Sequence, residues 1–200
     1  MPRRDDLETI LVLGSGPIKI GQAAEFDFSG SQAVQALRED GYRVILVNSN
    51  PATIQNDPEM ADVVYIEPLL PATIARIMEL ERPCALLAGM GGQTALNIAS
   101  ELSHNGTLER LNIELIGSDL EAIDKAEDRE LFNQVCESIQ LPISQAVACN
   151  TIDEVIAAAD LIGSWPILVR PAFTLGGLGG GTARDMGELV EISQLGLRNS

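Results

Sequence analysis

The sequence predicts an α/β protein in which a doubly wound parallel sheet is followed by a second, smaller α/β unit. The first observation is a series of short, continuous apolar runs within residues 9–117, which are typical of strands buried on both faces of a parallel sheet. The second is that segments with helical spacing of apolar residues separate these runs, as repeated strand–helix units require. The third is that glycine clusters follow several runs, at the edge where open α/β sheets bind ligands.

The first part of the chain accounts for the predicted sheet. The first helix is expected to begin near Ser29 or Ser31 and to end at Gly41, the second covers residues 71–81, and Thr94 caps the third. Four or five strands alternating with these helices favour a doubly wound architecture. The runs expected to form strands are residues 9–13, 44–47, 63–66, 85–88 and 114–117.

The pattern changes after Gly117, where Ser118 or Asp119 can cap a short helical turn. A dense charge run follows at residues 124–129, and such a run is usually a solvated helix face. The change predicts two domains, residues 1–125 and residues 126–200. The further elements expected are a helix at 129–139, a strand at 143–147, a helix capped by Thr151, a strand at 167–169 and a helix at 186–195.

Composition and charge exclude several classes of function. The 200 residues carry 13 Lys and Arg against 29 Asp and Glu, a formal net charge of −16, whereas nucleic-acid surfaces need clustered cations. No apolar run reaches membrane-spanning length, and the first residues lack the apolar segment of a signal peptide. Three cysteines without CxxC spacing and a single histidine, His104, encode no zinc site. We therefore expect a cytoplasmic protein that binds neither nucleic acid nor a membrane.

The stretch after the apolar run 167–169 carries the clearest chemical signal. Arg170 and Pro171 lead into a segment with five glycines within residues 176–181. Glycines let backbone N–H groups approach an anion closely and form a concave positive nest. The arginine adds a fixed fork of donors that suits phosphate oxygens. This combination predicts a phosphate-binding loop rather than only a flexible connection after a buried strand.

Two other glycine clusters are less specific. In residues 14–21 the third glycine falls two places too late for a GxGxxG fingerprint, and no acid ends the second expected strand, so a dinucleotide-dependent oxidoreductase is disfavoured. Residues 89–94 form the other cluster, which is consistent either with a second ligand-binding edge or with a tight strand-to-helix turn.

Five blocks of sequence, taken in order, resemble the N-terminal end of the carbamoyl-phosphate synthase large subunit family. The resemblance covers about the whole chain, and five blocks in the family's order are far more specific than any one of them. The blocks are residues 14–22 with 25–27, residues 48–53, residues 90–97, residues 124–129 and residues 170–177.

The resemblance implies that residues 1–125 form a Rossmann-like pre-ATP-grasp domain and residues 126–200 the first part of an ATP-grasp domain. The family's N-terminal half uses MgATP to phosphorylate bicarbonate, and ammonia then attacks the carboxyphosphate to give carbamate. A second half phosphorylates carbamate to carbamoyl phosphate, which feeds arginine and pyrimidine biosynthesis. The resemblance also implies a hetero-oligomer in which a glutaminase small subunit delivers the ammonia.

The matched positions imply specific roles. Arg129 and Arg170 are implied nucleotide contacts, and Gly176 and Gly177 belong to the loop that closes over the phosphates. Ala23 and Glu25 match positions that line the family's internal route for carbamate, although a buried or capping role suits Glu25 nearly as well. No catalytic residue is assigned. The family's ligands to Mg²⁺ or Mn²⁺ lie beyond residue 200, so we expect residues 1–200 alone to be inactive.

Two other classes of function remain as alternatives. Another ATP-grasp ligase, such as a biotin carboxylase or a carboxylate–amine ligase, would share the glycine loop and the order of domains. The blocks at residues 16–22 and 90–97 speak against it. A non-catalytic Rossmann-like module that binds a nucleotide or a partner subunit is the second alternative.

Overall fold

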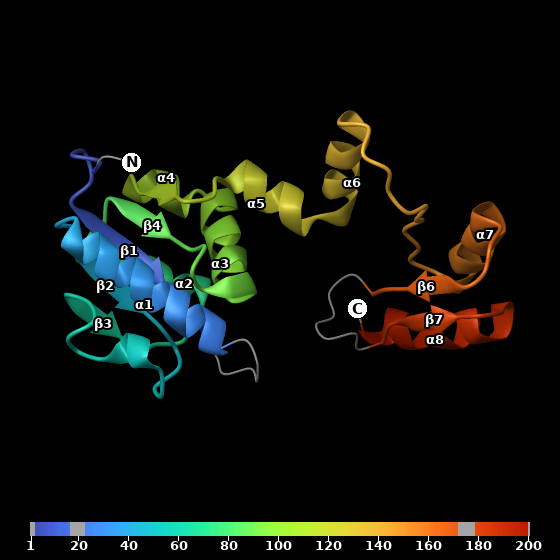
Figure 1. Ribbon diagram of the computed structural model, residues 1–200, viewed down its shortest axis with the longest axis horizontal. Helices are drawn as coiled ribbons and strands as arrows, with labels where there is room; N and C mark the ends of the chain where they lie inside the picture. Colours follow the sequence, from blue (N-terminus) through green and yellow to red (C-terminus); the bar gives the residue numbers. More distant parts are fainter. Residues whose placement is uncertain (1–2, 17–22, 172–178, 200) are drawn as a thin grey trace. The chain divides into compact units, whose positions relative to one another are not determined.

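The computed structural model describes residues 3–16, 23–171 and 179–199, and its contacts divide the chain into two compact units, Met1–Ser138 and Ile139–Ser200. Figure 1 shows the elements of both units and labels most of them. Those of the first unit are β1 (Thr9–Leu13), α1 (Ala23–Glu39), β2 (Arg43–Val47), η1 (Ile54–Asn56), β3 (Val63–Tyr65), α2 (Pro71–Glu81), β4 (Ala85–Leu87), α3 (Gly92–His104), α4 (Thr107–Leu111), β5 (Glu114–Ile116), α5 (Leu120–Glu127) and α6 (Arg129–Ser138).

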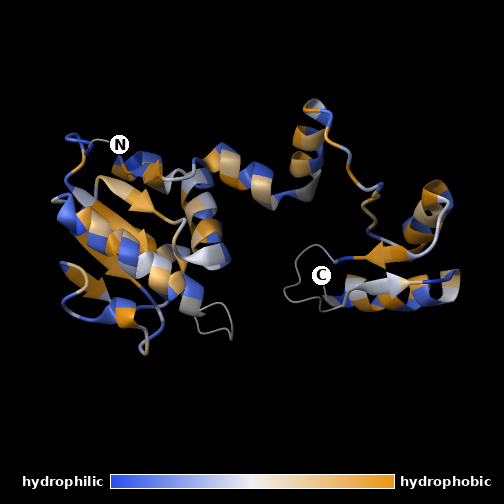
Figure 2. Cartoon of the chain, in the orientation of Figure 1, coloured by the Kyte–Doolittle hydropathy of each residue, from blue (hydrophilic) through white to orange (hydrophobic). Residues whose placement is uncertain are grey.

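The first unit is built on a five-stranded sheet with the order β3-β2-β1-β4-β5, and its neighbouring strands are all parallel. This order places β1 in the middle, with later strands added first on one side and then on the other, as in doubly wound folds. Figure 2 shows the strands as the hydrophobic centre of the unit. The predicted fold class is therefore confirmed.

Alternate residues of the strands pack on opposite faces of the sheet. Leu11 and Leu13 of β1 belong to the cluster that buries the apolar sides of α2 and α3, whereas Ile10 and Val12 belong to the cluster with Val34 of α1. This is the two-residue period of a strand that is covered on both sides. The arrangement leaves the carboxyl ends of the strands, and the loops that follow them, at one edge.

The second unit holds an antiparallel hairpin between two helices. Its core contains Ala159, Ile167, Ala183 and Leu189, contributed by all four elements. The hairpin pairs Val169 with Gly181 where the connecting segment leaves it. The elements of this unit are α7 (Ile152–Ile162), β6 (Ile167–Val169), β7 (Gly181–Ala183) and α8 (Met186–Asn199).

Two predicted helix starts were wrong. Helix α1 begins at Ala23 rather than near Ser29 or Ser31, and the Ser31 hydroxyl donates to the Asp27 carbonyl one turn back, at 2.7 Å. A serine that bonds within the helix in this way does not cap it. Helix α3 begins at Gly92 after a Gly91 cap, so Thr94 lies inside the helix.

Two further differences concern strands. The strand predicted at residues 143–147 is absent, because this segment is exposed throughout and buries none of its apolar side chains in a core, and in the described residues β6 pairs only with β7. Strand β7 was missed because its first residue, Gly181, was assigned to the glycine loop.

Helix α6 belongs to the first unit because it packs on α5. The domain boundary predicted between residues 125 and 126 stays a prediction.

Candidate functional site

Arg170 follows directly after β6, at the end of the hairpin where the glycine-rich segment begins. Its side chain is exposed, and among the described residues its guanidinium has no hydrogen bond or ion pair. By contrast, Arg43 is paired with Glu81 at 2.6 Å, and Arg110 is paired with Glu79 at 3.0 Å. The donors of Arg170 are thus available to an anionic ligand.

Helix α8 holds the two ends of the glycine-rich segment. A Cβ on Gly196 would lie 3.0 Å from the Gly179 carbonyl oxygen and 3.3 Å from Cγ of Pro171. Gly179 itself has a φ of 73°, a conformation that favours glycine. The absence of a side chain at Gly196 therefore lets the helix approach both ends of the segment and set where they lie.

The glycines at the carboxyl edge of the five-stranded sheet have a packing role. A Cβ on Gly91 would lie 2.4 Å from the Gly14 carbonyl oxygen, and one on Gly14 would lie 2.6 Å from Nδ2 of Asn48. No side chain fits at such distances, because the loops after β1, β2 and β4 meet here. The structure thus favours the tight strand-to-helix turn for the cluster at residues 89–94.

Asn48 organises a buried polar network at this edge. Its side chain is fully buried, and Oδ1 accepts from the N–H groups of Gly16 and Asn50, both at 3.1 Å. Its Nδ2 donates to Oγ of Ser15 at 3.3 Å and to Oε1 of Gln55 at 3.0 Å. A buried amide with all these partners fixes the loops after β1 and β2 relative to each other.

The network continues to helix α1. The Ser15 hydroxyl donates to Oδ1 of Asp27 at 2.7 Å, and Nε2 of Gln55 donates to the Phe26 carbonyl oxygen at 2.7 Å. Asn48 lies in one of the blocks that carry the family resemblance, residues 48–53, whereas Gln55 lies outside all of them. Its only signal was an amide next to the Pro-Ala-Thr turn, which is equally typical of an exposed loop.

The structure places the predicted site residues in both units. Ala23 is the first residue of α1, Glu25 is exposed in the first turn of that helix, and Arg129 is the first residue of α6. The side chains of Ala23 and Arg129 are outside the described part, as are Gly176 and Gly177 altogether. The roles assigned to these residues therefore stay predictions.

The described residues contain no group of three or more His, Cys, Asp or Glu side chains that could hold a metal ion. In the same residues, none of the helices has the length and apolar character needed to span a membrane.

Two family models match consecutive parts of the chain. The carbamoyl phosphate synthase preATP-grasp domain matches residues 6–125, and the ATP binding domain of the carbamoyl-phosphate synthase L chain matches residues 128–200. Among curated relatives, the carbamoyl phosphate synthase large chain of Nostoc sp. is 56% identical over 98% of this chain. That of Archaeoglobus fulgidus is 57% identical over all of it. The chain spans 18% of the length of each of these relatives.

Solved structures with the same fold are much more distant in sequence. The biotin carboxylase domain of the Hydrogenobacter thermophilus 2-oxoglutarate carboxylase, in complex with MgADP, ADP and bicarbonate, has a TM-score of 0.71 at 19% identity. It is matched over 95% of this chain and 40% of its own. The Campylobacter jejuni biotin carboxylase has a TM-score of 0.70 at 18% identity, over 96% of this chain and 41% of its own. These likenesses show the fold of ATP-grasp proteins.

The identities of 54–57% over 98–100% of the chain, and the two family models in their order, agree with each other. They also agree with the doubly wound sheet followed by a hairpin with a glycine-rich connection. The chain therefore belongs to the carbamoyl-phosphate synthase large chain family, a family of ATP-grasp ligases.

Proposed function

We propose that this chain is the N-terminal part of a large chain that phosphorylates bicarbonate with MgATP and converts the product to carbamate. A bicarbonate oxygen attacks the γ-phosphorus, ADP leaves, and the nitrogen of ammonia then attacks the carboxyphosphate carbon and expels phosphate. Phosphorylation of carbamate to carbamoyl phosphate is assigned to a second half outside these residues. The observation that carries the proposal is the match of a preATP-grasp model followed directly by an ATP-binding model.

The residues of this chain are proposed to bind and orient the nucleotide. The guanidinium of Arg170, which has no partner among the described residues and stands at the start of the glycine-rich segment, is suited to neutralise charge on the phosphates. Arg129, Gly176 and Gly177 are the other proposed ATP contacts. Support comes from the fold likeness to the Hydrogenobacter protein, which was solved with MgADP and bicarbonate.

Other parts of the proposal concern the whole protein. Mg²⁺ or Mn²⁺, held by residues beyond 200, would neutralise phosphate charge. A glutaminase small subunit would supply ammonia within a hetero-oligomer in the cytoplasm, and the product would serve arginine and pyrimidine biosynthesis. Ala23 and Glu25 are proposed to lie along the route of carbamate between the two halves. Without the remaining residues, the 200-residue piece is expected to be inactive.

The test of the proposed nucleotide role is Arg170→Ala in the full-length protein. Bicarbonate-dependent ATP hydrolysis without ammonia is expected to fall at least about tenfold, because a charged hydrogen bond to phosphate is worth about 1.5–3 kcal/mol. The exposed Arg184 in the same unit supplies the matched control, and Arg184→Ala is expected to retain turnover. Loss of the soluble fold in Arg170→Ala, or unchanged turnover, would contradict the role.

A biotin carboxylase is the competing function, because such proteins share the fold. The identity to them is 18–19%, against 56–57% to carbamoyl phosphate synthase large chains. Biotin is therefore expected to have no effect on bicarbonate-dependent ATP turnover by the full-length protein. Strong stimulation by free biotin would favour the competing function instead.

A further inference from the structure

Asp124, on the helix that leads to Arg129, contacts helix α3 through both carboxylate oxygens. The Ser100 hydroxyl donates to Oδ1 at 3.1 Å, and Nε2 of His104 lies 3.2 Å from Oδ2. Oγ of Ser100 also lies 3.2 Å from Nδ1 of His104, so the three side chains form a closed set. Ile123, the residue before Asp124, is buried.

The other described charged residues of α5 bond within their own helix. Glu121 pairs with Lys125 one turn later, and Asp119 caps the helix by accepting from the Ala122 N–H at 2.7 Å. Asp124 is thus the charged side chain of the described part of α5 that ties this helix to another one. The charge run predicted as a solvated helix face therefore contains one residue with a connecting role.

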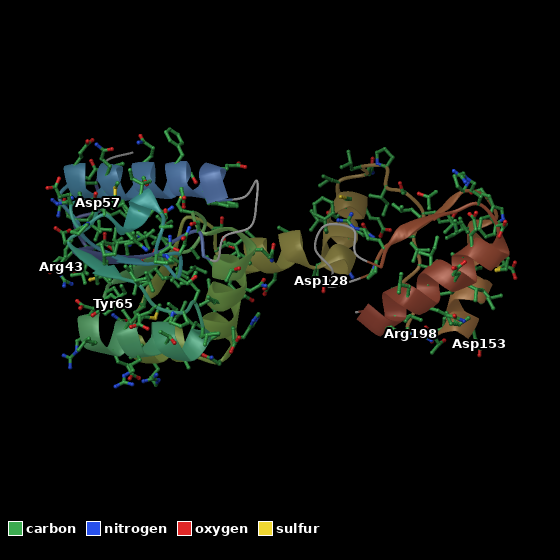
Figure 3. The ribbon with its side chains drawn as sticks, turned by 90° about the horizontal axis from the view of Figure 1, so that it is seen from below. Arg43, Asp57, Tyr65, Asp128, Asp153 and Arg198 are labelled. Atoms are coloured by element: carbon green, nitrogen blue, oxygen red, sulfur yellow. The ribbon has the colours of Figure 1, made fainter. Side chains whose placement is uncertain are left out.

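A short chain of hydrogen bonds joins Asp124 to the start of α6. The Asp128 N–H donates to the Asp124 carbonyl oxygen at 2.9 Å, and Oδ1 of Asp128 accepts from the Leu131 N–H at 3.0 Å. Asp128, labelled in Figure 3, is the single residue between α5 and α6. The direction in which α6 begins, and with it the backbone of Arg129, depends on where α5 is held.

We propose that Asp124, together with Ser100 and His104, is a positioning residue for the nucleotide contact at Arg129. The inference rests on the proposed function, because it gives Arg129 a ligand to contact. The three residues touch no nucleotide themselves. They fix α5 on α3, and α5 presents the first residue of α6.

The experiment measures steady-state kinetics of bicarbonate-dependent ATP hydrolysis by the full-length protein carrying Asp124→Ala. The KM for ATP is expected to rise about fivefold while kcat stays within about twofold, because a displaced contact weakens binding in folded enzyme. Asp124→Asn keeps an acceptor for Ser100 and is expected to retain part of the wild-type KM. A purely structural role would instead lower the amount of active enzyme, and so kcat, with KM unchanged, and that result would overturn the inference.

Glu121→Ala is the matched control, since it removes a carboxylate from the same helix without touching α3. It is expected to leave the KM for ATP unchanged, and an increase equal to that of Asp124→Ala would overturn the inference. The pair His104→Ala and Asp124→Ala should be non-additive in KM, because both break one contact. Full additivity would count against positioning through that contact.

Arg129→Ala separates this inference from the proposed function. If Arg129→Ala raises the KM for ATP and Asp124→Ala does not, the positioning role is wrong while the nucleotide role stands. If Arg129→Ala leaves KM unchanged, the nucleotide role of Arg129 fails and the inference fails with it. Should Asp124→Ala prove insoluble, Ser100→Ala and His104→Ala, which remove the partners on α3, decide the question by the same KM criterion.

Discussion

The two glycine-rich regions of this chain use glycine in different ways. At the carboxyl edge of the five-stranded sheet, Gly14 and Gly91 face backbone and buried amide atoms at distances of 2.4–2.8 Å from a would-be Cβ. In the second unit, Gly196 clears space for Pro171 and Gly179 at 3.0–3.3 Å, beside the exposed Arg170. The first region is closely packed around its glycines, whereas the second lies beside an arginine whose guanidinium has no hydrogen bond or ion pair within the described residues.

The difference shows that a glycine cluster after a strand does not by itself indicate a phosphate site. The clusters after β1 and β4 look much like the one after β6 in the sequence, yet a buried network around Asn48 occupies the edge where they meet. What separates the cluster after β6 is the residue beside it, Arg170, an exposed cation whose guanidinium has no partner among the described residues. The polar groups beside a glycine cluster therefore indicate a phosphate site better than the glycines themselves do.

The largest expected effect comes from filling the packed region. Gly91→Val should destabilise the first unit by about 3 kcal/mol or more, because its Cβ would lie 2.4 Å from the Gly14 oxygen and 2.7 Å from the Leu13 oxygen. Native-state hydrogen exchange of the β1 and β4 amides would measure this loss. Gly89→Ala is the matched control, since nothing lies within 4 Å of its Cβ position, and its cost should be small. Equal losses of stability at Gly89 and Gly91 would contradict the claim that the glycines of this region are required by packing.

A smaller effect is expected where α8 meets the glycine-rich segment. Gly196→Ala should raise the KM for ATP several-fold, because the added Cβ displaces the segment's two ends. Stability should change little, since alanine favours the helix by about 1 kcal/mol over glycine and offsets the crowding. Steady-state kinetics and a melting curve of the full-length protein check both parts. Gly187→Ala, in the first turn of the same helix and facing only a flexible side chain, should leave KM unchanged.

The smallest expected effect on stability concerns a charged contact in the first unit. Arg43 donates to Glu81 at 2.6 Å and the Tyr65 hydroxyl donates to the same carboxylate at 2.7 Å, which holds the pKa of Glu81 below its usual value. Arg43 and Tyr65 are labelled in Figure 3.

A lowered pKa means that this stabilisation is present above the pKa of an unfolded glutamate, about 4.3, and is lost as the pH falls through the folded value. Glu81→Gln should therefore cost about 1 kcal/mol at pH 7 and less as the pH falls below about 4. Hydrogen exchange of the β2 and β3 amides at several pH values measures the difference. A loss of unfolding free energy that does not change with pH would show that packing, and not charge, accounts for the stabilising effect of Glu81.

The strands of the first unit could be predicted because each contains a short apolar run and both faces of the sheet are covered. The start of α1 could not, since Ser29 and Ser31 resemble caps locally, and only the fold shows that Ser31 bonds back within the helix. The strand expected at 143–147 failed for a related reason: its apolar pattern suits a strand, but the fold leaves all of these residues exposed.

The site was predictable only in part. Arg170 follows an apolar run and precedes glycines, so sequence alone singles it out. The roles of Gln55 and Asp124 depend on contacts across 29 and 24 positions of the chain, to Phe26 and Ser100. Such long-range partners leave no local pattern, and a polar residue in a turn or a charge run looks the same whether or not it has them.

The most direct test of the central claim is hydrogen–deuterium exchange of the full-length protein with and without MgATP, in the presence of bicarbonate. Binding at the second unit predicts slower exchange in residues 170–181, with residues 88–95 unchanged. Slower exchange in residues 88–95 without any change in residues 170–181 would contradict the claim, and would place the nucleotide at the edge of the five-stranded sheet.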